Sequence, residues 1–458
     1  MSDFFAARLQ MALTLGTHII FACFGIGLPL LLIFVEWRFL KTGDELWRTL
    51  GKRWSKTFGV LFAVGAVSGT VLSFELGLLW PEFMGTFGAV IGLPFVLEGF
   101  AFFLEAIFVG IYLYTWDRLS PRVHWFTAFP IALSGLAGGT FVVAANAWMN
   151  VPSGFKLNKD GRIIDVDPMT ALFNPGMPAQ AAHMIVAALM VTGFMVAAYY
   201  AFETLKGRNS EYNRRAMAMG LGMGIISAML QGPVGHEAGH MVAKYQPIKL
   251  AAMEGHFETT DWAPLRIGGI PNMETRETTM AIEIPGGLSM IAFNDPTATV
   301  RGLNEFPDED LPPVAVVHFA FQAMVGIGTM LMGLGLWTLW RVWKKTPIED
   351  NRWLRLRTLW RVWKKMPIED NRWLLWTIVA AGPLSIVALE AGWIVTEVGR
   401  QPWIVHGYMR TSEAVTEAPG VVPLFIVTVS IYAVLVVGTV VTLQLLSHVP
   451  MPEPSHDA

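Results

Sequence analysis

Nine long apolar runs limit what this 458-residue chain can fold into. Each run reaches about 20 residues, the length that an α-helix needs to cross the hydrocarbon core of a bilayer. Only 15% of the residues are charged, whereas soluble chains usually carry about 25%. The sequence therefore predicts an all-α polytopic membrane bundle with about nine transmembrane helices in one integral-membrane domain, residues 1–458. The runs lie near residues 14–36, 54–79, 91–115, 123–149, 179–204, 215–235, 313–340, 373–397 and 420–446.

Lys and Arg are concentrated in four of the connections between these runs. The segments near 37–56, 116–122, 205–216 and 341–372 hold 22 of the 33 basic residues. The positive-inside rule makes these four connections cytoplasmic. We therefore expect the N-terminus outside and the C-terminus in the cytoplasm. The N-terminus has neither a basic segment nor a small-residue cleavage site, so we expect the first helix to be retained.

Two connections on the outer side are long, at about 150–178 and 236–312. The second contains six prolines and scattered charges, which predicts an ordered extracytoplasmic loop. The basic cytoplasmic loop at 341–372 contains an internal duplication. Residues 338–354 recur at 358–374 with one change, Thr346 to Met366. A tandem duplication or a sequence-assembly artefact explains this repeat, and we assign it no function.

The predicted spans contain almost no Lys or Arg, but they contain histidines and acids. An ionisable residue within a membrane helix is by default a candidate functional residue. Histidines and acids without matching bases suit metal coordination and proton transfer. For each residue alone, hydrogen bonding to a neighbouring helix remains the alternative. The residues are His18, Glu75, Glu98, Glu105, His183, Glu390 and Glu397.

Several of these residues are expected in one outer layer of the membrane. His18, His183 and Glu397 lie close to the outer ends of their spans, and Met324 lies about ten residues into the seventh span. An imidazole with a thioether is a known pair of axial haem ligands. Cys23 is the only cysteine, which excludes internal disulfides and Cys-ligated iron–sulfur clusters. The joint pattern predicts a membrane cytochrome.

Two helical faces place ionisable residues together. Glu390, Trp393, Glu397 and Arg400 fall within roughly 80° of one another on a helix, so this face should point into the protein. Glu98 and Glu105 are seven residues apart and lie on one face, separated by about 10 Å along the axis. Carboxyl groups at low dielectric can exchange protons near neutral pH, so the pair predicts a proton relay. Hydrogen bonds between helices are the alternative.

The segment His236-Glu-Ala-Gly-His240 matches the H-E-x-x-H zinc signature. That chemistry needs both histidines on one face of a regular helix. Here the motif follows Gly232-Pro233 and contains Gly239, so we expect irregular backbone at the start of a long loop. No segment in another span offers a third ligand. An intramembrane zinc protease is therefore only a minor alternative.

Seven short motifs give the chain a resemblance to subunit I of the cytochrome bd quinol oxidases, including the cyanide-insensitive branch, over nearly its whole length. The motifs are Arg8-Leu-Gln before His18, Glu98-Gly-Phe-Ala-Phe-Phe-Leu-Glu105, Trp116-Asp-Arg118, Asn146-Ala-Trp-Met149, Lys249-Leu-Ala-Ala-Met-Glu254, Glu390-Ala-Gly-Trp393 and Gly399-Arg-Gln-Pro-Trp403.

The resemblance implies three haems and their ligands. His183 and Met324 correspond to the axial ligands of a low-spin haem b. His18 and Glu397 correspond to ligands of two high-spin haems, one a haem b and the other a haem d or a third haem b. Trp393 resembles the electron conduit between the low-spin and high-spin haems.

The resemblance also implies roles in proton transfer and quinol oxidation. Glu98 and Glu105 match acids of the proton path and haem pocket. Arg400 would neutralise a haem propionate or Glu397. Lys249 and Glu254 match the pair implicated in quinol oxidation on the outer loop, which is called the Q-loop in this family. Glu254 would accept a quinol proton.

Two positions and the length of one loop depart from many members of the family. Gln322 stands where many relatives have an Arg, which predicts a lower potential for the low-spin haem. His236 stands where many have an Asp at the start of the Q-loop. The 236–312 loop is short, which indicates the short Q-loop class.

The implied function is that of the haem-bearing subunit of a terminal oxidase in the bacterial cytoplasmic (inner) membrane. It would oxidise ubiquinol or menaquinol and reduce O₂ to water, generating proton-motive force by vectorial chemistry. The implied partners are a membrane subunit II and a small single-helix subunit, and no nucleic acid is expected. A haem quinol dehydrogenase, a cofactor-free transporter and the zinc protease remain as alternatives.

Overall fold

A computed structural model describes residues 2–344 and 371–448. Within these residues, nine helices are long and apolar enough to cross a membrane, as predicted. They are α1 (Asp3–Thr42), α2 (Glu45–Leu79), α3 (Pro81–Tyr114), α4 (Pro121–Asn150), α6 (Met177–Leu205), α7 (Glu211–Tyr245), α10 (Val314–Lys344), α12 (Arg372–Val398) and α14 (Val421–His448). Of the duplicated segments, residues 345–354 and 358–370 lie outside the described residues.

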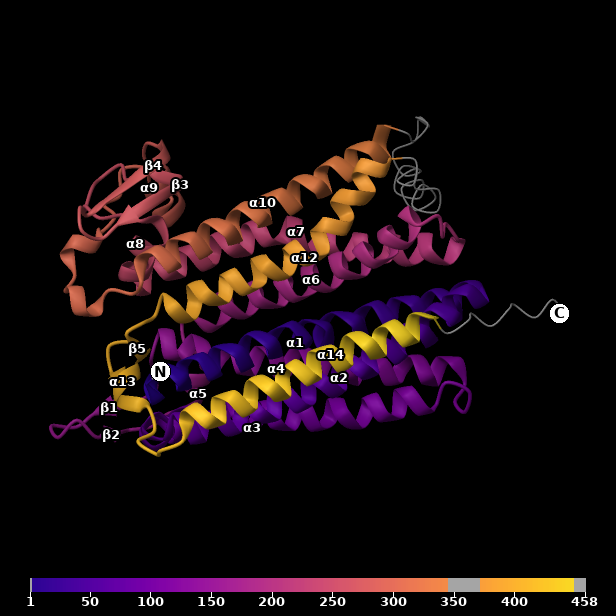
Figure 1. Ribbon diagram of the computed structural model, residues 1–458, viewed down its shortest axis with the longest axis horizontal. Helices are drawn as coiled ribbons and strands as arrows, with labels where there is room; N and C mark the ends of the chain where they lie inside the picture. The colour runs from indigo at the N-terminus through magenta and orange to yellow at the C-terminus, as the bar shows by residue number, and fades with distance from the viewer. Residues whose placement is uncertain (1, 345–370, 449–458) are drawn as a thin grey trace.

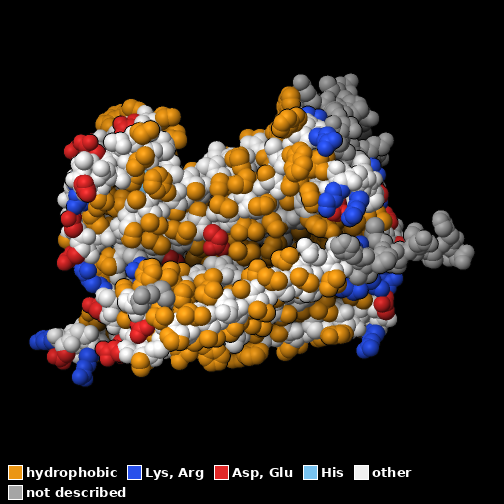
Figure 2. Space-filling model, in the orientation of Figure 1, with side chains coloured by type: hydrophobic (Ala, Val, Ile, Leu, Met, Phe, Trp, Pro, Cys, Tyr) orange, Lys and Arg blue, Asp and Glu red, His pale blue; other side chains and the backbone are white. Residues whose placement is uncertain are grey.

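The long helices form two groups that run side by side (Figure 1). One group contains α6, α7, α10 and α12, and the other contains α1, α2, α3, α4 and α14. Helix α6 joins them, since it packs against α7 and α12 on one side and against α1 and α4 on the other. Apolar side chains cover the middle of the visible face and charged side chains gather at its two ends, as a membrane-spanning bundle requires (Figure 2).

Local sequence explains where several helices begin. Ser2, Asp44, Ser210 and Asn371 each cap a helix with a side-chain oxygen that accepts a backbone N–H of the first turn. Such a cap contributes about 1 kcal/mol. Proline is tolerated within five of these helices, because neighbouring helices and local adjustment satisfy the freed backbone groups.

The close contact between α6 and α7 depends on glycine. A Cβ atom at Gly193 would lie 2.3 Å from the backbone nitrogen of Gly224, and one at Gly220 would lie 2.7 Å from that of Ala197. Small residues at a membrane-helix interface let two backbones approach and gain van der Waals contact. This contact fixes the helix that bears His183 against α7.

The connections predicted to lie outside form small ordered elements at one end of the bundle (Figure 1). Between α4 and α6 lie a hairpin of β1 (Lys156–Leu157) and β2 (Ile163–Ile164) and the short helix α5 (Pro168–Leu172). The loop after α7 contains α8 (Pro247–Glu254), the antiparallel strands β3 (Leu265–Asn272) and β4 (Glu277–Ile284), α9 (Gly287–Phe293), η1 (Leu303–Glu305) and η2 (Asp308–Asp310). After α12 come β5 (Trp403–Val405), β6 (Met409–Arg410) and α13 (Thr411–Ala414).

The predicted start of the long outer loop was wrong by ten residues. Helix α7 continues through the H-E-x-x-H segment to Tyr245, so residues 236–245 are helical and the loop begins at Gln246. Pro233 lies inside this helix without ending it. We expected irregular backbone because proline and glycine often interrupt helices in soluble proteins. Membrane helices tolerate both residues.

Candidate functional site

The C-terminal end of α12 holds a buried ion pair. Arg400 donates from Nη2 to Oε2 of Glu397 at 2.6 Å, and Oε1 of Glu397 accepts from the amide of Asn146 on α4. The Arg400 side chain is only 3% exposed. Its Nε and Nη1 have no partner within the described part of the chain. Because leaving buried donors unpaired is costly, this arrangement suits a further anionic group beside Arg400.

Lys249 of α8 joins the same group of residues. Its Nζ donates to Oδ1 of Asn150 at 2.6 Å and to the carbonyl of Thr396 at 3.1 Å. Burial, and then the nearby Arg400 guanidinium, lowers the pKa of Lys249 to about 7, whereas Glu397 opposes this shift. The ammonium group can therefore lose its proton near neutral pH.

A cavity of about 10 Å³, the size of one water molecule, adjoins Lys249 and Arg400. His406 and Asp310 also line it. Burial, followed by Lys249 and Arg400, lowers the pKa of His406. The cavity gives these polar groups room for a bridging water. Sequence reasoning missed His406, because no motif or apolar span marked it.

Glu254, the last residue of α8, lies buried within the 246–312 loop. It is 2% exposed, and its Oε2 has no partner within the described chain. Burial raises the pKa of Glu254 to about 7, although the backbone N–H and the charge of Arg266 oppose this. Glu254 and Lys249 thus lie on one short helix with different partners. The two residues belong to one sequence motif, but in the structure their side chains have different neighbours.

Gln322 attaches the 246–312 loop to α10. Its Oε1 accepts the backbone N–H of Gly268 at 3.0 Å, and its Nε2 donates to the carbonyl of Arg266 at 2.9 Å. Both contacts are to β3. The residue that departs from the family pattern therefore positions the strand beside Glu254.

His183 and Met324 lie on helices that flank α12. The amide nitrogen of Gln231 on α7 lies 3.1–3.2 Å from both ring nitrogens of His183. On the other side, a Cβ atom at Gly392 would lie 3.0 Å from Sδ of Met324, so the thioether rests directly on α12. Trp393 packs in a cluster that includes Met184, the neighbour of His183. The residues expected at the low-spin haem therefore surround one segment of α12.

His18 of α1 is oriented by a hydrogen bond to Ser68 of α2. Nδ1 lies 3.0 Å from Oγ of Ser68, and that hydroxyl donates its only hydrogen to the carbonyl of Gly65 at 3.0 Å. This arrangement suits the tautomer in which Nδ1 carries the ring hydrogen and Nε2 keeps its lone pair. Metal-binding histidines are usually oriented in this way by a hydrogen bond from the second nitrogen. Gly69 gives the ring its space, because a Cβ there would lie 2.8 Å from the imidazole.

Carboxyl groups from three other helices approach α1. Glu75 of α2 accepts from Gln10 at 2.8 Å and from Thr14 at 2.5 Å. Glu390 of α12 lies against Gly16, where a Cβ would be 3.1 Å from Oε2, and its Oε1 has no partner within the described residues. Figure 2 shows acidic atoms in the groove between the two helix groups.

Glu105 of α3 is the third carboxyl group at α1. A Cβ at Gly25 would lie 3.8 Å from its Oε1, and a Cβ at Gly135 of α4 would lie 3.4 Å away. Glu98, two turns earlier, is half-buried. The two acids predicted as a relay therefore lie on the helix face directed toward α1.

Sequence reasoning also missed a buried polar cluster at the other end of the bundle. Tyr112 donates to Glu36 at 2.5 Å, and Nδ1 of His124 lies 2.7 Å from the second Glu36 oxygen. Nε2 of His124 lies 2.9 Å from the carbonyl of Tyr112, and Trp116 lies against the imidazole with ring centroids 4.2 Å apart. The sequence contained a signal for this cluster, since Glu36 and His124 stand at the edges of apolar runs.

The H-E-x-x-H histidines meet the helical requirement of the zinc signature. His236 and His240 lie on α7 with their Nε2 atoms 3.0 Å apart. Among the described residues, however, no group of three or more His, Cys, Asp or Glu side chains could hold a metal ion. The zinc-protease alternative therefore lacks its third ligand in this part of the chain.

Comparisons with known proteins agree on one family. The family described as cytochrome bd terminal oxidase subunit I matches residues 6–449. A protein of Bacillus subtilis (strain 168), named as a cytochrome bd menaquinol oxidase subunit I, is 38% identical over 95% of this chain and 94% of its own length. A second protein of that organism, a cytochrome bd ubiquinol oxidase subunit 1, is 29% identical over 91% of this chain and 86% of its own length.

A solved structure shows the same fold. The bd oxidase from Geobacillus thermodenitrificans superposes with a TM-score of 0.86 at 38% identity. The match covers 97% of this chain and 98% of that one.

Proposed function

The chain belongs to the cytochrome bd terminal oxidase subunit I family, and we propose that His18, His183, Met324 and Glu397 hold its haem irons. As a subunit I it is part of a bacterial, membrane-embedded quinol oxidase of the respiratory chain. Membership of the family implies haems, a quinol substrate and further subunits.

The buried Arg400 supports this proposal most directly. Its two unpartnered nitrogens and its ion pair with Glu397 suit a carboxylate such as a haem propionate. The free Nε2 lone pair of His18 and the thioether of Met324 against Gly392 suit iron ligation. We propose one low-spin haem b, one high-spin haem b, and a haem d or third haem b.

Haem bound to these ligands would supply one-electron transfer and the iron at which O₂ is reduced. Residues of the chain itself would then accept and deliver the protons. Glu254, buried and with a pKa of about 7, accepts a proton from quinol at the outer loop. Glu98 and Glu105 deliver protons from the cytoplasmic side. Because the two proton movements face opposite sides of the membrane, turnover generates proton-motive force without a pump.

We propose menaquinol as the first substrate to test, because the more similar of the two Bacillus subtilis relatives is named for it. A membrane subunit II and a small single-helix subunit complete the proposed complex. The 246–312 loop is proposed to be a short Q-loop.

The test uses the purified complex, with reduced-minus-oxidised spectra, haem extraction and quinol-dependent O₂ uptake. His18→Ala should abolish O₂ uptake and spare the low-spin haem signal, because that haem is held elsewhere. Met324→Leu should alter the low-spin signal, whereas Met330→Leu, an exposed position on the same helix, should not. Absence of haem, or full O₂ uptake in His18→Ala, would refute the ligand assignment.

A further inference from the structure

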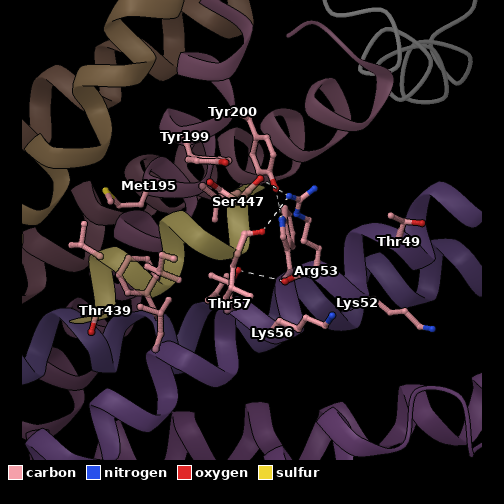
Figure 3. A pocket seen from close by; sticks show the side chains of 18 of the residues that line it. Thr49, Lys52, Arg53, Lys56, Thr57, Met195, Tyr199, Tyr200, Thr439 and Ser447 are labelled. Atoms are coloured by element: carbon pink, nitrogen blue, oxygen red, sulfur yellow. Dashed lines mark hydrogen bonds between the residues drawn. The ribbon is translucent and has the colours of Figure 1, made fainter. Parts of the chain in front are cut away.

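A second cavity, of about 640 Å³, lies between α1, α2, α6 and α14 (Figure 3). It adjoins the first turns of α2 and the last turns of α14, at the end of the bundle opposite Lys249 and Arg400. Its volume falls within the range of about 300–1,000 Å³ that is typical of ligand pockets. It shares no residue with the site described above.

One part of this cavity is apolar and opens toward the side of the bundle. Phe21 of α1, Leu61 of α2 and Met195 of α6 line its wall. Val440 of α14 and Tyr199 of α6 also line it, and they are 49% and 45% exposed on the lateral surface. In a membrane this opening faces the acyl chains of lipids rather than water.

The other part of the cavity is cationic. Arg48, Lys52 and Lys56 are spaced by four residues and form one stripe on α2, with Arg53 beside them. Glu45 is the only acidic residue among the lining residues. The rim therefore has an excess of positive charge.

The acidic partners available do not neutralise this rim. Arg48 and Lys52 both pair with Asp117, at 3.0 and 2.6 Å, and Arg48 also pairs with Glu45 at 3.7 Å, so two carboxylates face four basic side chains. Lys56 is exposed and forms no hydrogen bond or ion pair with the described part of the chain. A negatively charged group at the rim would satisfy this excess.

Arg53 links the rim to the end of α14. Its Nη2 donates to the carbonyls of Leu446 and Ser447 at 3.3 and 2.7 Å. Figure 3 shows Arg53 directed toward Tyr200 and Ser447. A molecule in the cavity would therefore contact both α2 and the last turns of α14.

We propose that this cavity binds an anionic phospholipid, with its phosphate on the Lys52–Lys56 rim and an acyl chain along the apolar wall. Basic pockets between transmembrane helices on the cytoplasmic side are suited to anionic headgroups. A quinone has a neutral headgroup, which would leave the four basic side chains of the rim without a counter-charge. Inorganic phosphate makes no use of the apolar wall. The lipid would bridge α2, α6 and α14 and stabilise the ninth span against the bundle.

The first experiment compares the purified complex in nanodiscs of phosphatidylglycerol and of phosphatidylcholine, and then measures retained lipid by native mass spectrometry. We expect phosphatidylglycerol to be retained and to raise the thermal midpoint. In Lys52→Gln/Lys56→Gln, retention should fall by about fivefold per lysine. The control Lys41→Gln/Arg122→Gln removes two exposed charges at the same end without touching the cavity and should retain lipid like the wild type.

A second variant tests the apolar wall separately. Val440→Trp fills the cavity without changing its charge and should also lose phosphatidylglycerol. Equal retention of phosphatidylcholine, the same thermal shift with inorganic phosphate alone, or unchanged retention in Val440→Trp would each overturn the proposal. It would also be overturned if a density map of the complex shows polypeptide from another subunit in the cavity.

Discussion

Glu254 is the group in the outer loop that should set the pH dependence of quinol oxidation. Burial raises its pKa to about 7, and only the ionised carboxylate can accept a quinol proton. We therefore expect kcat/KM for quinol to rise with pH through about 7 and to level off above it. Quinol-dependent O₂ uptake by the purified complex, measured across this range, checks the profile.

The same shift has a consequence for stability. Because the folded pKa lies above its ordinary value of 4.5, the folded state binds the Glu254 proton more tightly than the unfolded chain does. The contribution of this group to the free energy of unfolding falls as pH rises from 4.5 to about 7.

Glu254→Gln removes the titrating group, so its residual activity should lack this rise with pH. Glu258→Gln, which changes an exposed acid four residues further along the chain, serves as the matched control and should keep the rise. An unchanged pH profile in Glu254→Gln would show that another group accepts the proton.

His124 is expected to matter for stability rather than for haem binding. His124→Ala leaves an oxygen of buried Glu36 without its partner, which costs about 1–3 kcal/mol. The thermal midpoint of the complex should fall, while the haem spectrum stays as in the wild type. Val123→Ala, at an exposed neighbouring position, should have little effect. A variant as stable as the wild type would mean that the cluster contributes nothing to folding.

At the scale of helices, the contact of α12 with α10 should control the low-spin haem. A methyl group in Gly392→Ala would approach Sδ of Met324 to 3.0 Å, so the thioether must move by a few tenths of an ångström. We expect the reduced-minus-oxidised spectrum and the midpoint potential of this haem to shift. Both are measured by a redox titration.

Gly333→Ala is the control for that change. It lies on α10, and a Cβ there meets no atom within 4 Å. This variant should leave the haem signal unchanged and stabilise the helix by up to about 1 kcal/mol. Identical spectra for Gly392→Ala and the wild type would argue against Met324 as a ligand.

Helix α7 shows why the limits of elements were harder to predict than their existence. The apolar run at 215–235 predicted the span, but the polar residues that follow continue the helix by ten residues. A helix projecting beyond the hydrocarbon needs no apolar sequence. Its length is then decided by packing against neighbours such as α8 and α9, which hydropathy does not report.

At the scale of the whole molecule, the charge distribution predicts orientation. If the four basic connections are cytoplasmic, a C-terminal green fluorescent protein should fluoresce, and alkaline phosphatase at the same position should be inactive. Alkaline phosphatase inserted in the turn at 158–161 should be active, because this turn lies at the opposite end of the bundle. The reverse pattern of activities would overturn the predicted orientation.

The sequence by itself determined the nine spans and the types of residue buried in them. Apolar length is a local property, and the bilayer converts it directly into a helix. The motifs indicated the family and the candidate ligands His18, His183, Met324 and Glu397, and the family was confirmed by the comparisons. Their roles as ligands stay a prediction.

Only the tertiary structure decided which partners these residues have. Asn146, Lys249 and Glu397 come from α4, α8 and α12, and Arg400 directly follows α12; they meet through helix rotation and packing. The cluster of Glu36 and His124 depends in the same way on α1 and α4 lying together. Hydropathy fixes how deep a residue lies in the membrane, but not which helix it faces. That choice depends on close contacts between helices far apart in the chain, such as that of Gly27 on α1 with Thr192 on α6.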